Sequence, residues 1–256
     1  MIKFIKSKKL LNIDNNSKTV KGQKYRYKTA ILYLAPARIS GYNVCPFADD
    51  CSKTCLNTAG RGQMSTVQKG RINKTLWFFN ERETFIKQLI NEIVKFELHC
   101  KNNKFKPCIR LNGTSDINWE NFELFKQFPN INFYDYTKQP KRMYKYINGQ
   151  YESNYHLTFS LGSSNKEEAK QVLKMGGNIA VVFRNKKLPR QFMGYRVFNA
   201  DKSDLRFKDP KNVIAGLYAK GKARKDKTGF VQDVIQLLKI FFTHLVYINK
   251  ILLNMV

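Results

Sequence analysis

Short apolar runs alternate with helical stretches along the chain, and this alternation limits the fold more than any other sequence feature. Seven runs predict strands, over residues 30–36, 107–113, 131–137, 155–162, 178–183, 195–201 and 212–221. Helical periodicity predicts helices over residues 66–79, 82–100, 119–128 and 166–175. Repeated strand–helix units place successive strands parallel in one sheet. With no internal linker, the sequence predicts a single α/β domain over residues 1–256.

Two architectures satisfy this order of elements: a closed or partly closed barrel, and an open doubly wound sheet. A nucleotide-binding open sheet normally carries G-x-G-x-x-G after its first strand or a G-x-x-x-x-G-K-[ST] loop. Neither motif occurs at the expected place in this chain. The sequence therefore favours a TIM-like barrel, in an incomplete form, with a cysteine-containing loop after the first strand.

Three of the five cysteines lie within eleven residues of that loop. Cys45, Cys51 and Cys55 have the spacing C-x5-C-x3-C, and the odd total rules out a fully paired disulfide framework. Structural zinc normally takes four ligands, whereas three thiolates can hold a [4Fe-4S] cluster and leave one iron open. We expect these cysteines to bind one [4Fe-4S] cluster with a small-molecule ligand at the open iron. Zinc and no metal at all stay as alternatives, and Cys100 and Cys108 are expected in the core.

Polar residues cluster where the predicted strands end, which is the edge that carries the chemistry in barrel enzymes. We expect Asp135 and Lys138 to do acid–base chemistry and Arg110 to hold an anionic substrate. The polar residues assigned to cofactor binding are Asn112, Ser115, Asp116 and Ser160. Taken singly, each of these residues is also an ordinary loop or helix-capping residue.

The net charge supports a different class of function. The chain has 46 Lys and Arg against 19 Asp and Glu, a net charge of +27, which favours acidic partners such as nucleic acid. Residues 138–151 interleave basic side chains with aromatic ones. Lys141 and Arg142 could therefore contact phosphates while the Tyr144 ring stacks on nucleobases. The alternative for that stretch is a solvated helix and turn. The alternative function is a basic nucleic-acid-binding protein with structural zinc or no metal.

The two ends of the chain bear on its location. Residues 1–16 lack the apolar stretch of a secretory signal. Residues 234–256 are apolar but contain Lys239 and Lys250, and a charge near the middle of a membrane costs about 3 kcal/mol. We expect an apolar C-terminal helix packed on the domain, no membrane partner, and thiols kept reduced inside a cell.

Five segments resemble a bacteriophage family called gene product 88. They are "LAPARISGYNVCPFADDCSKTCLNTAGRG", "RLNGTSD", "FYDYTK", "GGNIAVVF" and "VIAGLYAKGKARKDKTGF", and the resemblance covers about Leu34 to Phe230. It implies a viral gene, and therefore the cytoplasm of the infected host cell, without an assigned reaction.

The placement of the cysteine loop is also similar to that of radical S-adenosylmethionine enzymes. Their usual spacing is C-x3-C-x2-C, and "LNGTSD" stands here where they have a Gly-Gly-Glu motif. The similarity implies S-adenosylmethionine as the ligand of the open iron.

Overall fold

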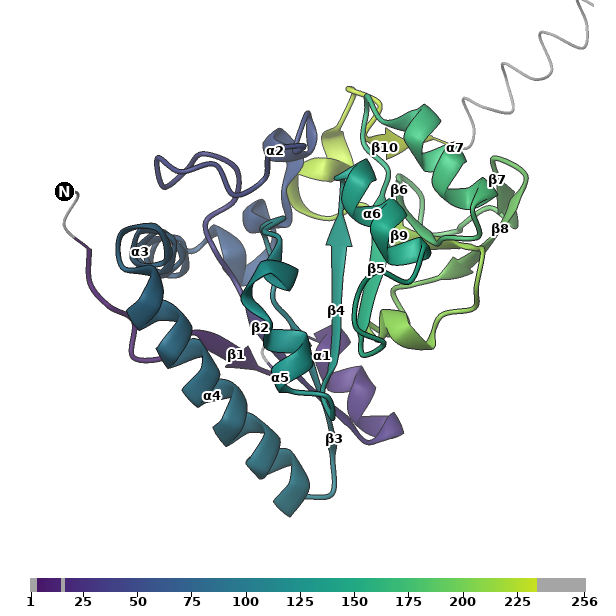
Figure 1. The fold of residues 1–256 in the computed structure, drawn as a ribbon. Coiled ribbons are helices and arrows are strands. Elements are labelled where there is room, and N and C mark those ends of the chain that lie inside the picture. The colour runs from purple at the N-terminus through teal and green to yellow at the C-terminus, as the bar shows by residue number, and fades with distance from the viewer. Residues whose placement is uncertain (1–3, 15–16, 234–256) are drawn as a thin grey trace, which may run out of the picture.

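A mostly parallel sheet of ten strands forms the centre of the computed structural model, which describes residues 4–14 and 17–233 (Figure 1). The strands, in their order across the sheet, are β1 (Leu11–Ile13), β2 (Tyr27–Leu32), β3 (Lys106–Arg110), β4 (Asn132–Thr137), β5 (Tyr155–Ser160), β6 (Ile179–Phe183), β9 (Ile214–Tyr218), β8 (Tyr195–Asn199) and β7 (Gln191–Phe192). Strand β10 (Val231–Gln232) pairs with β6 outside this path. Strands β2 to β6 are neighbours in chain order and parallel, as the repeated strand–helix units predict.

The sheet is open in its described pairing, with β1 and β7 at the two ends of the order. Antiparallel pairs occur at these ends, between β1 and β2 and between β7 and β8. The mixed α/β class is confirmed, and all seven predicted strands are present. The TIM-like barrel itself stays a prediction.

Helices connect the parallel strands. They are α3 (Ser65–Asn80) and α4 (Arg82–Asn102) before β3, α5 (Leu124–Gln127) before β4, α6 (Pro140–Ile147) before β5, and α7 (Lys166–Lys174) before β6. Two single-turn helices, α1 (Ser17–Val20) and α2 (Cys51–Thr54), lie in the first part of the chain. The predicted helix over 119–128 is wrong as one element. Glu123 has a left-handed backbone (φ 54°), which separates a 3-10 turn, Trp119–Phe122, from α5.

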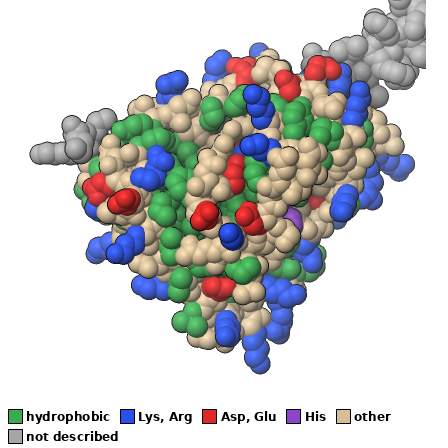
Figure 2. All heavy atoms as spheres, viewed as in Figure 1, with side chains coloured by type: hydrophobic (Ala, Val, Ile, Leu, Met, Phe, Trp, Pro, Cys, Tyr) green, Lys and Arg blue, Asp and Glu red, His purple; other side chains and the backbone are tan. Residues whose placement is uncertain are grey.

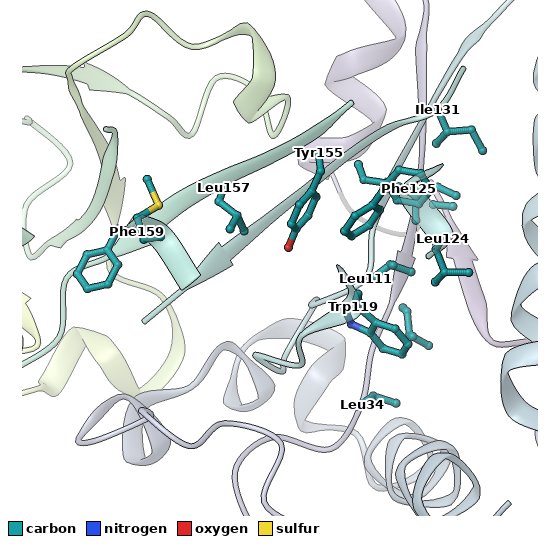
Figure 3. Packing of buried hydrophobic residues seen from close by; sticks show 14 of the residues in the cluster. Leu34, Leu111, Trp119, Leu124, Phe125, Ile131, Tyr155, Leu157 and Phe159 are labelled. Carbon is teal, nitrogen blue, oxygen red and sulfur yellow. The ribbon is translucent and has the colours of Figure 1, made fainter. Parts of the chain in front are cut away.

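The main core lies between the sheet and these helices. Alternate residues of the strands, including Ile109, Phe133, Leu157 and Phe159, are buried against it. Figure 3 shows part of this packing, where Phe125 stacks on Tyr155 with ring centroids 3.9 Å apart. The expected core cysteines behave as predicted, since Cys100 and Cys108 are both fully buried.

The predicted C-terminal helix over 234–256 lies outside the described residues. Among the helices of residues 4–14 and 17–233, none has the length and apolar character needed to span a membrane.

Candidate cysteine-loop site

The cysteine loop lies against the loop that follows β3. The backbone N–H of Asp116 donates to the carbonyl of Val44 over 2.8 Å, and the Thr114 hydroxyl donates to the carbonyl of Leu34. The thiol of Cys45 lies 3.7 Å from the carbonyl of Thr114. Because β2 and β3 are parallel, these contacts hold the loop over the carboxyl edge of the sheet.

Each of the three thiols is partly sheltered. The Ala37 N–H donates to Sγ of Cys45 over 3.5 Å, and the Asn57 N–H donates to Sγ of Cys55 over 3.5 Å. Cys51 packs on a small apolar cluster that includes Ala219, Ala223, Phe230 and Val231. Burial raises the pKa of Cys45 to about 12 and that of Cys55 to about 11, and it raises the pKa of Cys51.

The three thiols are neighbours. Burial is the main cause of the raised pKa of Cys45, and the hydrogen bond from the Ala37 N–H lowers that pKa. The charges of Cys55 and Cys51 raise it further, and the charge of Cys51 likewise raises the pKa of Cys55. Within the part of the chain that the structure describes, however, no three His, Cys, Asp or Glu side chains are arranged to hold a metal ion. The loop thus brings the thiols to one region without gathering them around one point.

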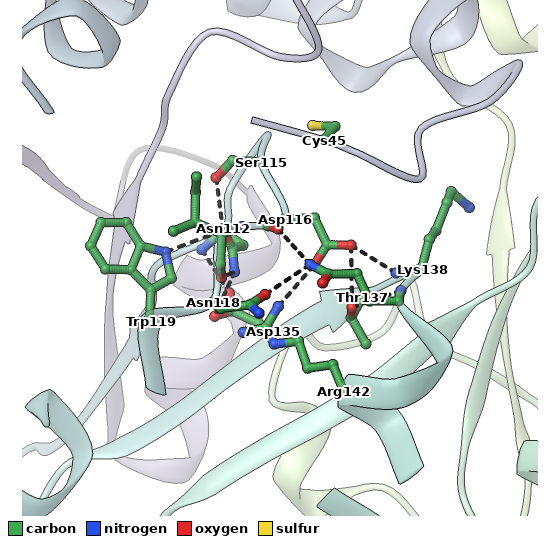
Figure 4. Close-up of polar contacts among 12 residues, drawn as sticks. Cys45, Asn112, Ser115, Asp116, Asn118, Trp119, Asp135, Thr137, Lys138 and Arg142 are labelled. Atoms are coloured by element: carbon green, nitrogen blue, oxygen red, sulfur yellow. Dashed lines mark hydrogen bonds and ion pairs between the residues drawn. The ribbon is translucent and has the colours of Figure 1, made fainter. Parts of the chain in front are cut away.

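Asn112 organises the polar residues beneath the loop (Figure 4). Its Oδ1 accepts hydrogen bonds from the Ser115 hydroxyl at 2.8 Å and from the Trp119 indole at 3.2 Å. Its backbone N–H and Nδ2 donate to the two carboxylate oxygens of Asp135, at 2.7 and 3.3 Å. Asp135 is almost fully buried, and burial raises its pKa to about 7. The structure therefore brings Asn112, Ser115 and Asp135 into one network.

Asp116, which follows Ser115 in the chain, makes a second set of contacts, with α6 and the residues before it. Its carboxylate accepts from the Lys138 N–H at 2.9 Å and from the Arg142 guanidinium at 2.8 Å. Arg142 also forms two hydrogen bonds of 2.9 Å with Glu120 and contacts the hydroxyl of Tyr155. The Arg142 side chain is only 2% exposed. The expectation that Arg142 meets phosphates is therefore wrong, because its charge is buried and paired.

Lys138 joins the network to the end of β5. Its Nζ donates to the Ser160 hydroxyl at 3.0 Å and to the carbonyls of Ser160 and Leu161 at 3.2 and 3.0 Å. Burial lowers its pKa, while the nearby Cys51 raises it. Lys138 also lines a hollow of about 340 Å³ together with Phe47, Asp49, Ser164 and Glu168. This hollow lies between the cysteine loop and the loop before α7.

Arg110 lies on the other face of the sheet. Ile109 pairs with Phe133, so Arg110 shares a face with Tyr134, whereas Asp135 shares one with Phe133. The Arg110 guanidinium stacks 4.7 Å from the Tyr136 ring and lies 3.6 Å from the Asp204 carboxylate. The three residues predicted to be catalytic therefore do not form one constellation, since Asp135 and Arg110 face opposite sides.

Sequence reasoning missed the segment that covers the loop. The 3-10 turn Gly221–Lys225 packs on α2 and on the turn Leu56–Thr58. Gly221 has φ +56°, and a Cβ there would come within 2.9 Å of Ala59, so the two segments are in close contact. The Ser163 hydroxyl contacts the carboxylates of Asp49 and Asp50 from a third segment. The left-handed glycine in "YAKGKA" is the one sequence signal of this turn.

These features define an α/β protein with a three-cysteine loop over the carboxyl edge of a mostly parallel sheet. The family model of gene product 88 matches residues 7–234, so the chain belongs to this family of bacteriophage gene products. The comparisons with curated proteins and with solved structures find no match.

Proposed function

We propose that the protein binds one [4Fe-4S] cluster through Cys45, Cys51 and Cys55. One observation carries the proposal: three partly sheltered, free thiols lie in a single loop at the carboxyl edge of the sheet. Thiolates are the ligands that iron–sulfur clusters take in proteins. Three thiolates leave one iron of such a cluster open, whereas structural zinc normally takes four ligands.

The surroundings of the thiols suit a negatively charged cluster. Two of the thiols already accept backbone N–H groups, and hydrogen bonds to sulfur tune such clusters. Lys138 adds a buried positive charge near Cys51. The raised pKa values mean that metal binding must displace the thiol protons, which couples loading to the folding of the loop.

The hollow beside Lys138 gives the proposal a place for a small ligand. A bound cluster would supply an open iron able to polarise a ligand or pass an electron. The chain would supply Lys138 as a positive charge that is held in place. It would also supply the carboxylates of Asp49 and Glu168, which line the hollow. S-adenosylmethionine is one candidate ligand. A protein similar to the radical S-adenosylmethionine enzymes is therefore one version of this proposal. An incomplete TIM-like barrel and a location in the cytoplasm of the infected host are parts of it.

Metal analysis after oxygen-free purification tests the proposal. We expect a brown protein with a broad band near ~400 nm and about four irons and four sulfides per chain. Cys45→Ala, Cys51→Ala and Cys55→Ala should each lower the iron content, whereas Cys100→Ala, in the core, should not. A colourless chain with zinc or without metal would refute the iron–sulfur function.

A basic nucleic-acid-binding protein is the second candidate, and the net charge of +27 supports it. On the face shown in Figure 2, blue Lys and Arg side chains are spread around the surface rather than gathered in one patch. Binding to single-stranded nucleic acid should then weaken steeply as salt rises. Tight binding by a metal-free chain would favour this candidate over the first.

A further inference from the structure

The longest helix of the described residues, α4, presents an outer face that the rest of this part of the chain does not cover. Its inner face buries Phe85, Leu89, Ile93 and Phe96 in the core. On the outer side, Val94 is 50% exposed and Leu98 is 56% exposed. Hydrophobic side chains reach the surface between charged ones in this region (Figure 2). Two large apolar side chains on one exposed stripe are a feature of interaction surfaces.

A row of six positions on this face, called the seam, has heptad spacing; four of the six are charged, and only Ile90 and Val94 are apolar. The positions Glu83, Lys87, Ile90, Val94, Glu97 and Lys101 are spaced alternately by four and three residues. This spacing keeps a seam of side chains directed at a second helix. Ile86 and Leu98 lie on opposite flanks of the seam. A hollow of about 420 Å³ lies at the first half of the seam, lined by Ile86, Ile90 and Phe122.

The charges of the seam are complementary to those of a second copy of the seam that runs in the opposite direction. In an antiparallel pair whose twofold axis crosses the seam midway between Ile90 and Val94, Ile90 lies against Val94 of the second copy. In the same pair, Glu83 meets Lys101 of the second copy and Lys87 meets Glu97 of the second copy. Among the described residues, none of these four charges takes part in a salt bridge within its own chain.

We propose that two copies of this chain associate through antiparallel α4 helices along this seam. Isologous contact is the commonest way for identical chains to pair, and it requires a self-complementary patch such as this one. A helix of 21 residues is about 31 Å long, so the contact is of modest size. We therefore expect a dimer that dissociates on dilution. This contact is independent of the cysteine loop.

Charge reversal tests the pairing directly. Sedimentation velocity of the full chain, at fixed salt and several concentrations, measures the association. Glu83→Lys places like charges opposite Lys101 of the second copy, and Lys101→Glu does the same opposite Glu83. Each single change should weaken association about tenfold or more, and the double change should restore it. Lys95→Glu makes the same charge change as Lys101→Glu, on an exposed position outside the seam, and should preserve the dimer.

The double variant makes the test decisive, and circular dichroism of each variant should match the wild type because the changed side chains lie at the surface. A wild-type chain that stays monomeric at every concentration overturns the pairing. A double variant that associates no better than the singles also overturns it. Association that neither single change weakens places the contact elsewhere in the chain and rejects the seam.

Discussion

The carboxylate of Asp116 and the guanidinium of Arg142 lie 2.8 Å apart in a buried ion pair. This pair ties the loop after β3, which supports the cysteine loop, to α6, which follows β4. Glu120 completes the arrangement on the other side of Arg142. The position of the candidate site thus depends on a charge that lies outside it.

Arg142→Met should strongly destabilise the fold, because it leaves two buried carboxylates without their cation. Breaking a buried pair in this way costs about 3–5 kcal/mol. Urea unfolding of the metal-free chain measures the change in unfolding free energy. Lys145→Met, on an exposed position of the same helix, should change it by less than about 0.5 kcal/mol. Equal effects of the two substitutions would show that the ion pair contributes little.

Stability should fall as the pH rises from about 4 to 7, because of buried carboxyl groups. Burial raises the pKa of Asp135 to about 7, above the ~3.9 of an unfolded Asp. Its contribution is therefore complete below about pH 4 and is lost as the pH rises through 7, by roughly 4 kcal/mol. Burial also raises the pKa of Asp209 to about 7, so this carboxyl changes the stability in the same direction.

Unfolding free energies of Asp135→Asn at several pH values test this dependence. The variant cannot titrate at this position, so its stability should change less between pH 4 and 7 than that of the wild type. Asp209→Asn should remove a further part of the slope. A wild-type slope that survives in both variants would show that neither carboxyl is its source.

Lys138→Met should lower both stability and iron content. The substitution keeps the apolar stem but leaves the hydroxyl of Ser160 and the carbonyls of Ser160 and Leu161 without their donor. We expect a loss of about 1–3 kcal/mol, measured by urea unfolding. Iron analysis of the folded variant tests the charge near Cys51 separately. Lys141→Met, which is exposed on α6, is the control and should leave both quantities unchanged.

Gly113→Ala should displace β2 from β3. A Cβ at this position would lie 2.5 Å from the Tyr33 ring, 2.7 Å from the Leu32 carbonyl and 2.8 Å from Ile31. Overpacking of this kind costs about 1–3 kcal/mol in thermal or urea unfolding. Gly70→Ala is the opposite case, because no atom lies within 4 Å of the added carbon in the middle of α3. It should stabilise the chain by about 0.5–1 kcal/mol.

The sequence predicted the elements that are long enough to show a period. The stretches 155–162 and 178–183 contain β5 and β6, because five or six residues reveal a buried strand. Strands β1, β7 and β10 have only three, two and two residues, so no pattern could identify them. Their pairing partners come from elsewhere in the chain.

The candidate site was predictable in its composition but not in its geometry. The strand-end argument selected Asn112, which hydrogen-bonds to Asp135 and Ser115, and Asp116, which hydrogen-bonds to Lys138. It could not separate Arg110 from Asp135, because a one-residue difference in register decides which face each side chain takes. It also missed Arg142, whose partner Asp116 is 26 residues away in the chain.

The cover of the cysteine loop is synthesised long after the loop itself. Cys55 precedes Ala219, the first residue of the apolar cluster on Cys51, by 164 positions. At about 5–20 residues per second, roughly 8 to 33 seconds pass before the ribosome reaches that cluster. During this interval Cys51 lacks the burial that this cluster gives it. Under the iron–sulfur proposal, Cys51 is therefore more accessible to iron and sulfide in the unfinished chain than in the finished one.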